Sequence, residues 1–134
     1  MTQPDFSGRW KFDPEASILQ IDIPDFADFQ IEHLDSKFRL ERTIEFAGRS
    51  DTFAITLEID AENPPFFRHQ SKMHPSLHWE GDQLVFRTVI ITENEEATNL
   101  VRYWLESNGS VLVASENFES PSLKYQNRWV LTKQ

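Results

Sequence analysis

The chain has 134 residues, of which 39% are hydrophobic, and these values predict one domain spanning residues 1–134 around a single core. The formal net charge of −9 disfavours binding to nucleic acid or to an anionic membrane surface. The absence of cysteine excludes disulfides and thiolate chemistry.

Near the N-terminus a first strand, Gly8–Phe12, precedes the one stretch that carries helical signals. Asp13-Pro14-Glu15 places an N-cap residue before a proline at the first helical position, and Pro24-Asp25 resembles the start of a second short turn. We therefore expect one or two short helices between Asp13 and Ala27.

The segment Lys37–Phe46 alternates polar and apolar side chains with a period of two. Phe38, Leu40, Ile44 and Phe46 share one face of this segment, as expected for a strand that packs on a core. Other segments between turn residues also have strand character. They are Ala27–Leu34, Thr52–Asp60, Phe66–Met73, Ser76–Glu80, Gln83–Thr92, Ala97–Glu106, Val111–Phe118 and Leu123–Thr132.

About ten strands with short connections favour an all-β, up-and-down antiparallel β-barrel of about eight to ten strands. Closure into a barrel removes the two exposed edges that an open meander would leave. A barrel of this size can hold one small ligand, or its interior can be filled by side chains.

The segment Phe6-Ser7-Gly8-Arg9-Trp10-Lys11 contains Gly-x-Trp on the first strand. With the strand count, this motif resembles the calycin superfamily of lipocalins, fatty-acid-binding proteins and avidins. In that superfamily the Trp closes one barrel end against a basic residue of the last strand, and Gly8, Trp10 and Arg128 match these positions. The resemblance implies a lipocalin-like barrel that captures a small apolar or amphipathic molecule.

Arg42 lies between Leu40 and Ile44 on an otherwise apolar face, which directs its guanidinium into the barrel. There it could bind a carboxylate or another anionic head group. The alternatives are that it pairs with an acidic side chain or reaches water at the barrel mouth. Arg42 is therefore the first candidate ligand-binding residue.

Other side chains on apolar faces are candidates for the same site. His33 shares its face with Ile31, and His69 shares its face with Met73, although a core histidine bonded to backbone or water explains either position as well. In the late strands, polar and aromatic side chains mix on one face. The candidates there are Arg102, Trp104 and Tyr125.

We expect no metal, no cofactor and no catalytic residue. His74 and His78 would lie about 13 Å apart along an extended strand, too far to share one ion. The sequence contains no Gly-x-Ser-x-Gly motif and no glycine-rich phosphate loop. An enzyme that uses the barrel cavity stays open as an alternative, as does a filled barrel with a structural or interaction role.

These patterns predict a protein that binds a small hydrophobic or amphipathic ligand, with anionic ligands included, inside the barrel. We expect a monomer or a homodimer. No apolar run approaches the length of a membrane span, and no leader-like segment opens the chain, so we expect a cytoplasmic protein without membrane insertion.

Overall fold

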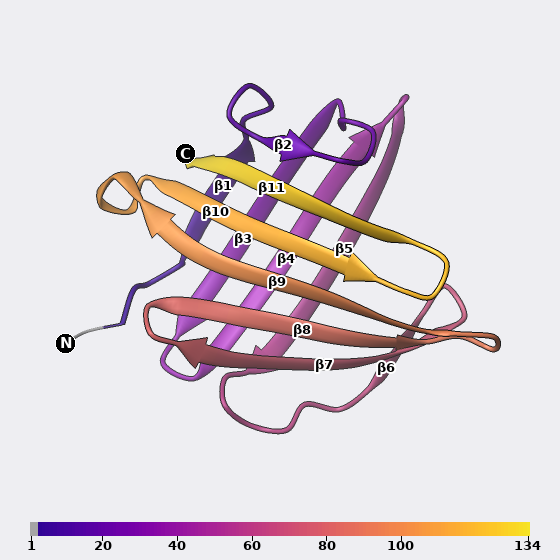
Figure 1. Cartoon of the computed structure of the whole chain (residues 1–134). Coiled ribbons are helices and arrows are strands. Elements are labelled where there is room, and N and C mark those ends of the chain that lie inside the picture. Colours follow the sequence, from indigo (N-terminus) through magenta and orange to yellow (C-terminus); the bar gives the residue numbers. More distant parts are fainter. Residues whose placement is uncertain (1–2) are drawn as a thin grey trace.

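The computed structural model describes residues 3–134 and consists almost entirely of antiparallel strands (Figure 1). They form one 11-stranded sheet. The strands are β1 Gly8–Phe12, β2 Ile18–Leu19, β3 Phe26–Leu34, β4 Lys37–Phe46, β5 Arg49–Glu58, β6 Phe66–Arg68, β7 Ser71–Glu80, β8 Gln83–Ile91, β9 Glu96–Glu106, β10 Val111–Glu119 and β11 Lys124–Lys133. The predicted all-β class and meander are confirmed.

The sheet curls so that β3, β4 and β5 cross behind β7 to β11, with the core between the two layers (Figure 1). The strand order is β5-β4-β3-β1-β11-β10-β9-β8-β7-β6, so β5 and β6 are the two ends of the path. Side chains bridge this seam: Arg68 Nη2 lies 2.6 Å from Asp51 Oδ2, and the Phe53 and Phe66 rings stack at 6.0 Å. These side-chain contacts bridge the two ends of the curled sheet, where the strands are not paired.

The short helices predicted between Asp13 and Ala27 are absent, so this prediction is wrong. Asp13 Oδ1 accepts the backbone N–H of Glu15, as an N-cap would. The chain then leaves the helical path, because Ile18 and Leu19 pair with β11. Within residues 3–134 the helical element is the 3-10 turn η1, Ser107–Gly109.

The predicted and observed strand boundaries differ most around β6 and β7. The sequence predicts that Pro75 separates two strands. Pro75 instead lies inside β7, opposite Thr88 of β8. Proline is tolerated there because β6 pairs only with the first residues of β7, so the missing N–H faces the unpaired seam. The chain turns earlier, at His69 and Gln70, which have φ angles of 50° and 66°.

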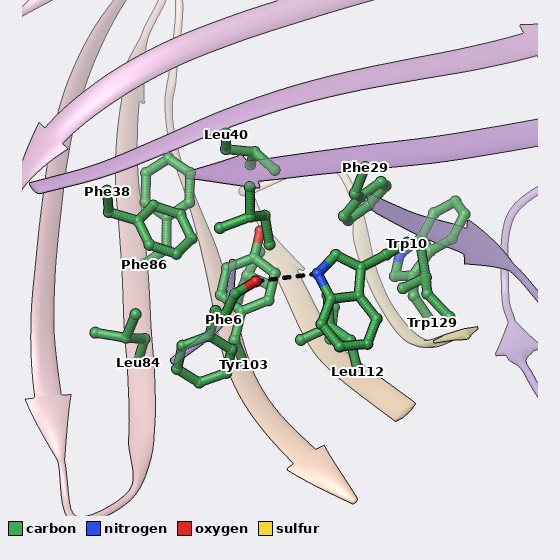
Figure 2. Packing of buried hydrophobic residues seen from close by; sticks show 14 of the residues in the cluster. Phe6, Trp10, Phe29, Phe38, Leu40, Leu84, Phe86, Tyr103, Leu112 and Trp129 are labelled. Carbon is green, nitrogen blue, oxygen red and sulfur yellow. Dashed lines mark hydrogen bonds between the residues drawn. The ribbon is translucent and has the colours of Figure 1, made fainter. Parts of the chain in front are cut away.

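The core fills the barrel end built from β1, the end of β3 and the start of β4 (Figure 2). Phe6, Trp10 and Phe38 are fully buried there. The Trp10 indole N–H donates to the Phe6 carbonyl at 3.0 Å, the bond drawn in Figure 2. Large aromatic side chains thus supply much of the apolar surface that folding buries.

The basic residue that covers Trp10 is Lys133, and the predicted role of Arg128 is wrong. Lys133 pairs with Trp10 across β1 and β11, and its Nζ lies 5.6 Å from the centroid of the indole ring. Gly8 has a φ angle of 146°, which side chains rarely tolerate, and a Cβ there would also lie 3.0 Å from Lys133 Cε, so this position favours glycine. Arg128 points outward and lies over Trp104 instead, with 5.6 Å between its Cζ and the ring centroid.

Candidate ligand-binding site

A cavity of about 150 Å³ lies inside the barrel, beyond the core end that contains Trp10. Arg42 and Phe53, which face each other across β4 and β5, both lie on its wall. Most of the wall is apolar, and a few polar groups interrupt it. The lining residues are Arg42, Phe53, Phe66, Arg68, Met73, Phe86, Thr88, Ile90 and Asn99. An apolar cavity with a few convergent polar groups is the usual form of a small-molecule site.

Arg42 points into this cavity without a counter-ion in contact. Among residues 3–134, no carboxylate oxygen lies within 4.0 Å of its guanidinium. Arg42 is half-buried, and its Cζ lies 5.5 Å from the centroid of the Phe53 ring, a cation–π contact. The cavity therefore offers an unpaired cation to a bound molecule.

Arg68 adds a second guanidinium to the same wall, but this one has a partner. Besides its ion pair with Asp51, it lies over Phe53 with 4.4 Å between its Cζ and the ring centroid. Because Asp51 neutralises Arg68, the charge that remains available to a ligand is that of Arg42.

The carboxylate of Glu116 also lies inside the barrel and is held by neutral donors. Asn127 and Trp129 donate to Glu116 Oε1 at 2.9 and 3.0 Å, and Asn99 donates to Oε2 at 3.0 Å. Hydrogen bonds of this number can stabilise a carboxylate without a cation. Glu116 therefore does not need Arg42 as its direct partner.

Both tyrosines of the chain lie near these two charges. Burial raises the pKa of Tyr103 well above its usual value, Glu116 adds to the increase, and Arg42 opposes it. Burial also raises the pKa of Tyr125, again with a further increase from Glu116. A raised pKa in the folded state means that folding favours the neutral phenol.

These pKa increases predict a specific alkaline unfolding behaviour. The tyrosines contribute stability that is fully present below their unfolded pKa of about 10, and this stability is lost as the pH rises toward the folded pKa values. We expect phenolate absorbance and loss of circular dichroism to develop together in an alkaline titration. The variant Tyr103→Phe should unfold at higher pH than the wild type. Phenolate formation near pH 10 in a fully folded protein would contradict this expectation.

Comparisons with known proteins agree with the geometry of the barrel. No family model matches the chain, and no curated protein matches it by sequence. Among solved structures, it is similar to secretory abundant heat soluble protein 4 from Ramazzottius varieornatus, with a TM-score of 0.64, 13% identity, and coverage of 100% of this chain and 99% of that chain. The chain has the calycin fold.

Two further structures support this calycin barrel. Lipid binding protein 8 of Caenorhabditis elegans aligns with a TM-score of 0.60 and 14% identity over 96% of this chain and 95% of that chain. Human cRBP IV aligns with a TM-score of 0.64 and 14% identity over 98% and 99% of the two chains. At identities this low, the structural similarity establishes the fold alone. The ligand has to be inferred from the residues of this chain.

The predicted site histidines lie away from the calycin cavity. His33 is buried in the core, where its Nδ1 accepts the backbone N–H of Phe6 at 3.3 Å and its ring contacts Phe38 and Trp79. His69 lies in the exposed turn between β6 and β7 and lines a hollow on the outer surface. His33 thus points inward as a core histidine bonded to the backbone, and neither histidine lines the cavity that holds Arg42.

Arg102 and Trp104 point outward from β9, so their predicted inward orientation is also wrong. Arg102 Nη1 lies 2.7 Å from Glu80 Oε1, and this hydrogen bond, together with His78, lowers the pKa of Glu80. The Trp104 indole N–H donates to Glu106 at 3.0 Å. Both strand faces of β9 carry apolar residues, so alternation alone did not identify the inner one.

Tyr125 faces the barrel interior, as predicted, and stacks on Phe118 with 4.9 Å between ring centroids. It lines a wider hollow of about 540 Å³ near the ends of β9, β10 and β11, outside the cavity that holds Arg42. A neighbouring hollow of about 670 Å³ is lined mainly by polar and charged residues, including Glu96, Glu119 and Lys124. We favour the smaller cavity as the site because it combines apolar walls with an unpaired cation.

Sequence reasoning missed Asn99 and Glu116, because both faces of β9 and β10 carry apolar residues and alternation does not identify the inner face as it does for Arg42. Asn99 alternates with Val101 and Tyr103, and Glu116 alternates with Ala114 and Phe118. Each is thus a polar residue on the strand face that points into the barrel.

Within residues 3–134, no group of three or more His, Asp or Glu side chains is arranged to hold a metal ion. None of the described helical segments is long and apolar enough to cross a membrane.

Proposed function

We propose that this protein binds a small amphipathic anion inside the barrel, with the acid group on Arg42 and the apolar part against the aromatic wall. The carrying observation is the guanidinium of Arg42, which lines an apolar cavity with no carboxylate of residues 3–134 in contact. Turning an unpaired arginine inward costs free energy, and an anionic ligand would offset that cost.

The size of the cavity supports a compact ligand. A volume of about 150 Å³ accommodates a group of about the size of one six-membered ring. The names of two similar structures, lipid binding protein 8 and cRBP IV, are compatible with an apolar component in the ligand.

The enzyme alternative has less support, because neither His33 nor His69 lines the cavity. The alternative of a barrel filled by side chains agrees with the packed end around Trp10. It does not explain why Arg42 points into the cavity at the other end. The cytoplasmic location and the oligomeric state stay predictions from the sequence. One of the similar structures is that of a protein named as secretory.

Titration calorimetry with phenylacetate and its neutral analogue phenylacetamide tests the proposal. The two molecules have nearly the same shape and differ in charge, so we expect the acid to bind about tenfold tighter or more. Binding should also show a negative heat-capacity change from burial of the ring. Equal affinities, or no binding of either compound, would refute the proposed function.

A further inference from the structure

Asn99 lines the cavity and carries one unpartnered polar atom, its Oδ1. Its Oδ1 is buried and has no hydrogen-bond partner among the described residues. Buried side-chain oxygens of this kind are nearly always paired, because burial removes their hydrogen bonds to water. The atom therefore needs a partner that the chain does not provide.

The surrounding network fixes which atom of the Asn99 amide is left over. The backbone N–H of Gln20 donates to Asn127 Oδ1 at 2.8 Å, so Asn127 must present its NH₂ group to Glu116. The indole N–H of Trp129 also donates to Glu116. The carboxylate of Glu116 only accepts, so Asn99 must turn its NH₂ group toward it as well. A flipped Asn99 would bring two acceptors together.

Because Oδ1 is an acceptor, its missing partner is a donor. Thr88 faces Asn99 across β8 and β9, and Arg42 lines the same cavity, but within residues 3–134 neither donates to Oδ1. One small cavity is therefore lined both by an unpaired cation and by the residue that carries the unpaired acceptor. This combination is complementary to a molecule with an acid group and a separate donor.

We propose that the ligand is a compact organic acid that also carries a hydroxyl or N–H group, which donates to Asn99 Oδ1 while the acid group binds Arg42. This inference rests on the proposed function and narrows its ligand class. The apolar wall, which includes Phe53 and Phe86, packs against the ring or short chain that joins the two groups. No covalent step is involved.

Binding of phenylacetate, mandelate and para-hydroxyphenylacetate by the full chain tests this inference. The three acids share one skeleton, and the two hydroxy acids place a donor either near the acid group or far from it. We expect at least one of the hydroxy acids to bind the wild type about tenfold tighter than phenylacetate. The variant Asn99→Leu should lose this preference, which is measured as the ratio of its affinities for the hydroxy acid and for phenylacetate.

The matched control is Asn117→Leu, on β10 next to Glu116 but facing the outer hollow. It should keep the preference for the hydroxy acid. If Asn99→Leu does not fold, the side-chain amide resonance of Asn99 in the nitrogen-labelled wild type replaces it. That resonance should shift with the preferred hydroxy acid more than with phenylacetate.

Three negative outcomes have different meanings. If phenylacetate binds through Arg42 but neither hydroxyl group improves affinity, a water molecule satisfies Asn99 and the inference fails while the proposed function stands. If a hydroxyl preference persists in Asn99→Leu, the donor binds elsewhere and the inference also fails. If phenylacetate itself does not bind, the proposed function fails first.

Discussion

Replacing Arg42 by leucine should lower the affinity for phenylacetate by about 10- to 100-fold, the loss expected when a charge-assisted hydrogen bond worth about 1.5–3 kcal/mol is removed. Stability should change in the opposite direction. Arg42 has no carboxylate in contact in the described chain, and leucine would remove an inward-facing charge from an apolar wall. We expect an unchanged or higher melting temperature together with weaker binding, measured by thermal denaturation and calorimetry on the same preparation.

Arg39→Leu is the control for this prediction. Arg39 lies on the same strand but faces outward, where its Nη2 lies 3.2 Å from Glu41 Oε2. Its replacement should leave ligand affinity unchanged. If Arg42→Leu binds phenylacetate as the wild type does, or if it loses binding only because it is less stable, then Arg42 is a structural residue and the proposed site is wrong.

Replacing Trp10 by alanine should have the largest effect on folding. Trp10 is fully buried, donates to the Phe6 carbonyl and lies beneath Lys133. Substitutions of this kind cost about 3–5 kcal/mol, a large fraction of the roughly 5–15 kcal/mol that stabilises a typical domain. Denaturant unfolding followed by circular dichroism measures the loss as a lower midpoint at an unchanged slope.

The matched variant is Trp104→Ala, which removes the same side chain from the outer face of β9. Trp104 is partly exposed and bonds to Glu106 at the surface, so its loss should cost about 1 kcal/mol. Comparable losses in the two variants would mean that the core is not concentrated at the end of the barrel that Trp10 occupies.

Strand β4 shows why part of this structure was predictable. One face of Lys37–Phe46 carries Phe38 and Leu40, which are buried, and the opposite face is uniformly polar. A single shift in register would expose the whole apolar set, so alternation determines the orientation and with it the inward placement of Arg42.

Strand β9 shows where this reasoning fails. Leu100 and Trp104 lie on one face, and Val101 and Tyr103 lie on the other, so hydrophobicity does not distinguish inside from outside. The register with β8 and β10 decides the orientation, by placing Tyr103 opposite Leu84 and Ala114 in the core. Arg102 was assigned to the wrong face for this reason.

The sequence by itself determined the all-β class, the meander of strands and the inward direction of Arg42, because these depend on alternation within single segments. Only the tertiary structure decided that Lys133 covers Trp10 and that Glu116 on β10 accepts hydrogen bonds from Asn99 on β9 and from Asn127 and Trp129 on β11. The physical reason is that hydrogen-bond partners and cavities depend on the register and curvature of strands far apart in the chain, and local side-chain patterns do not contain that information.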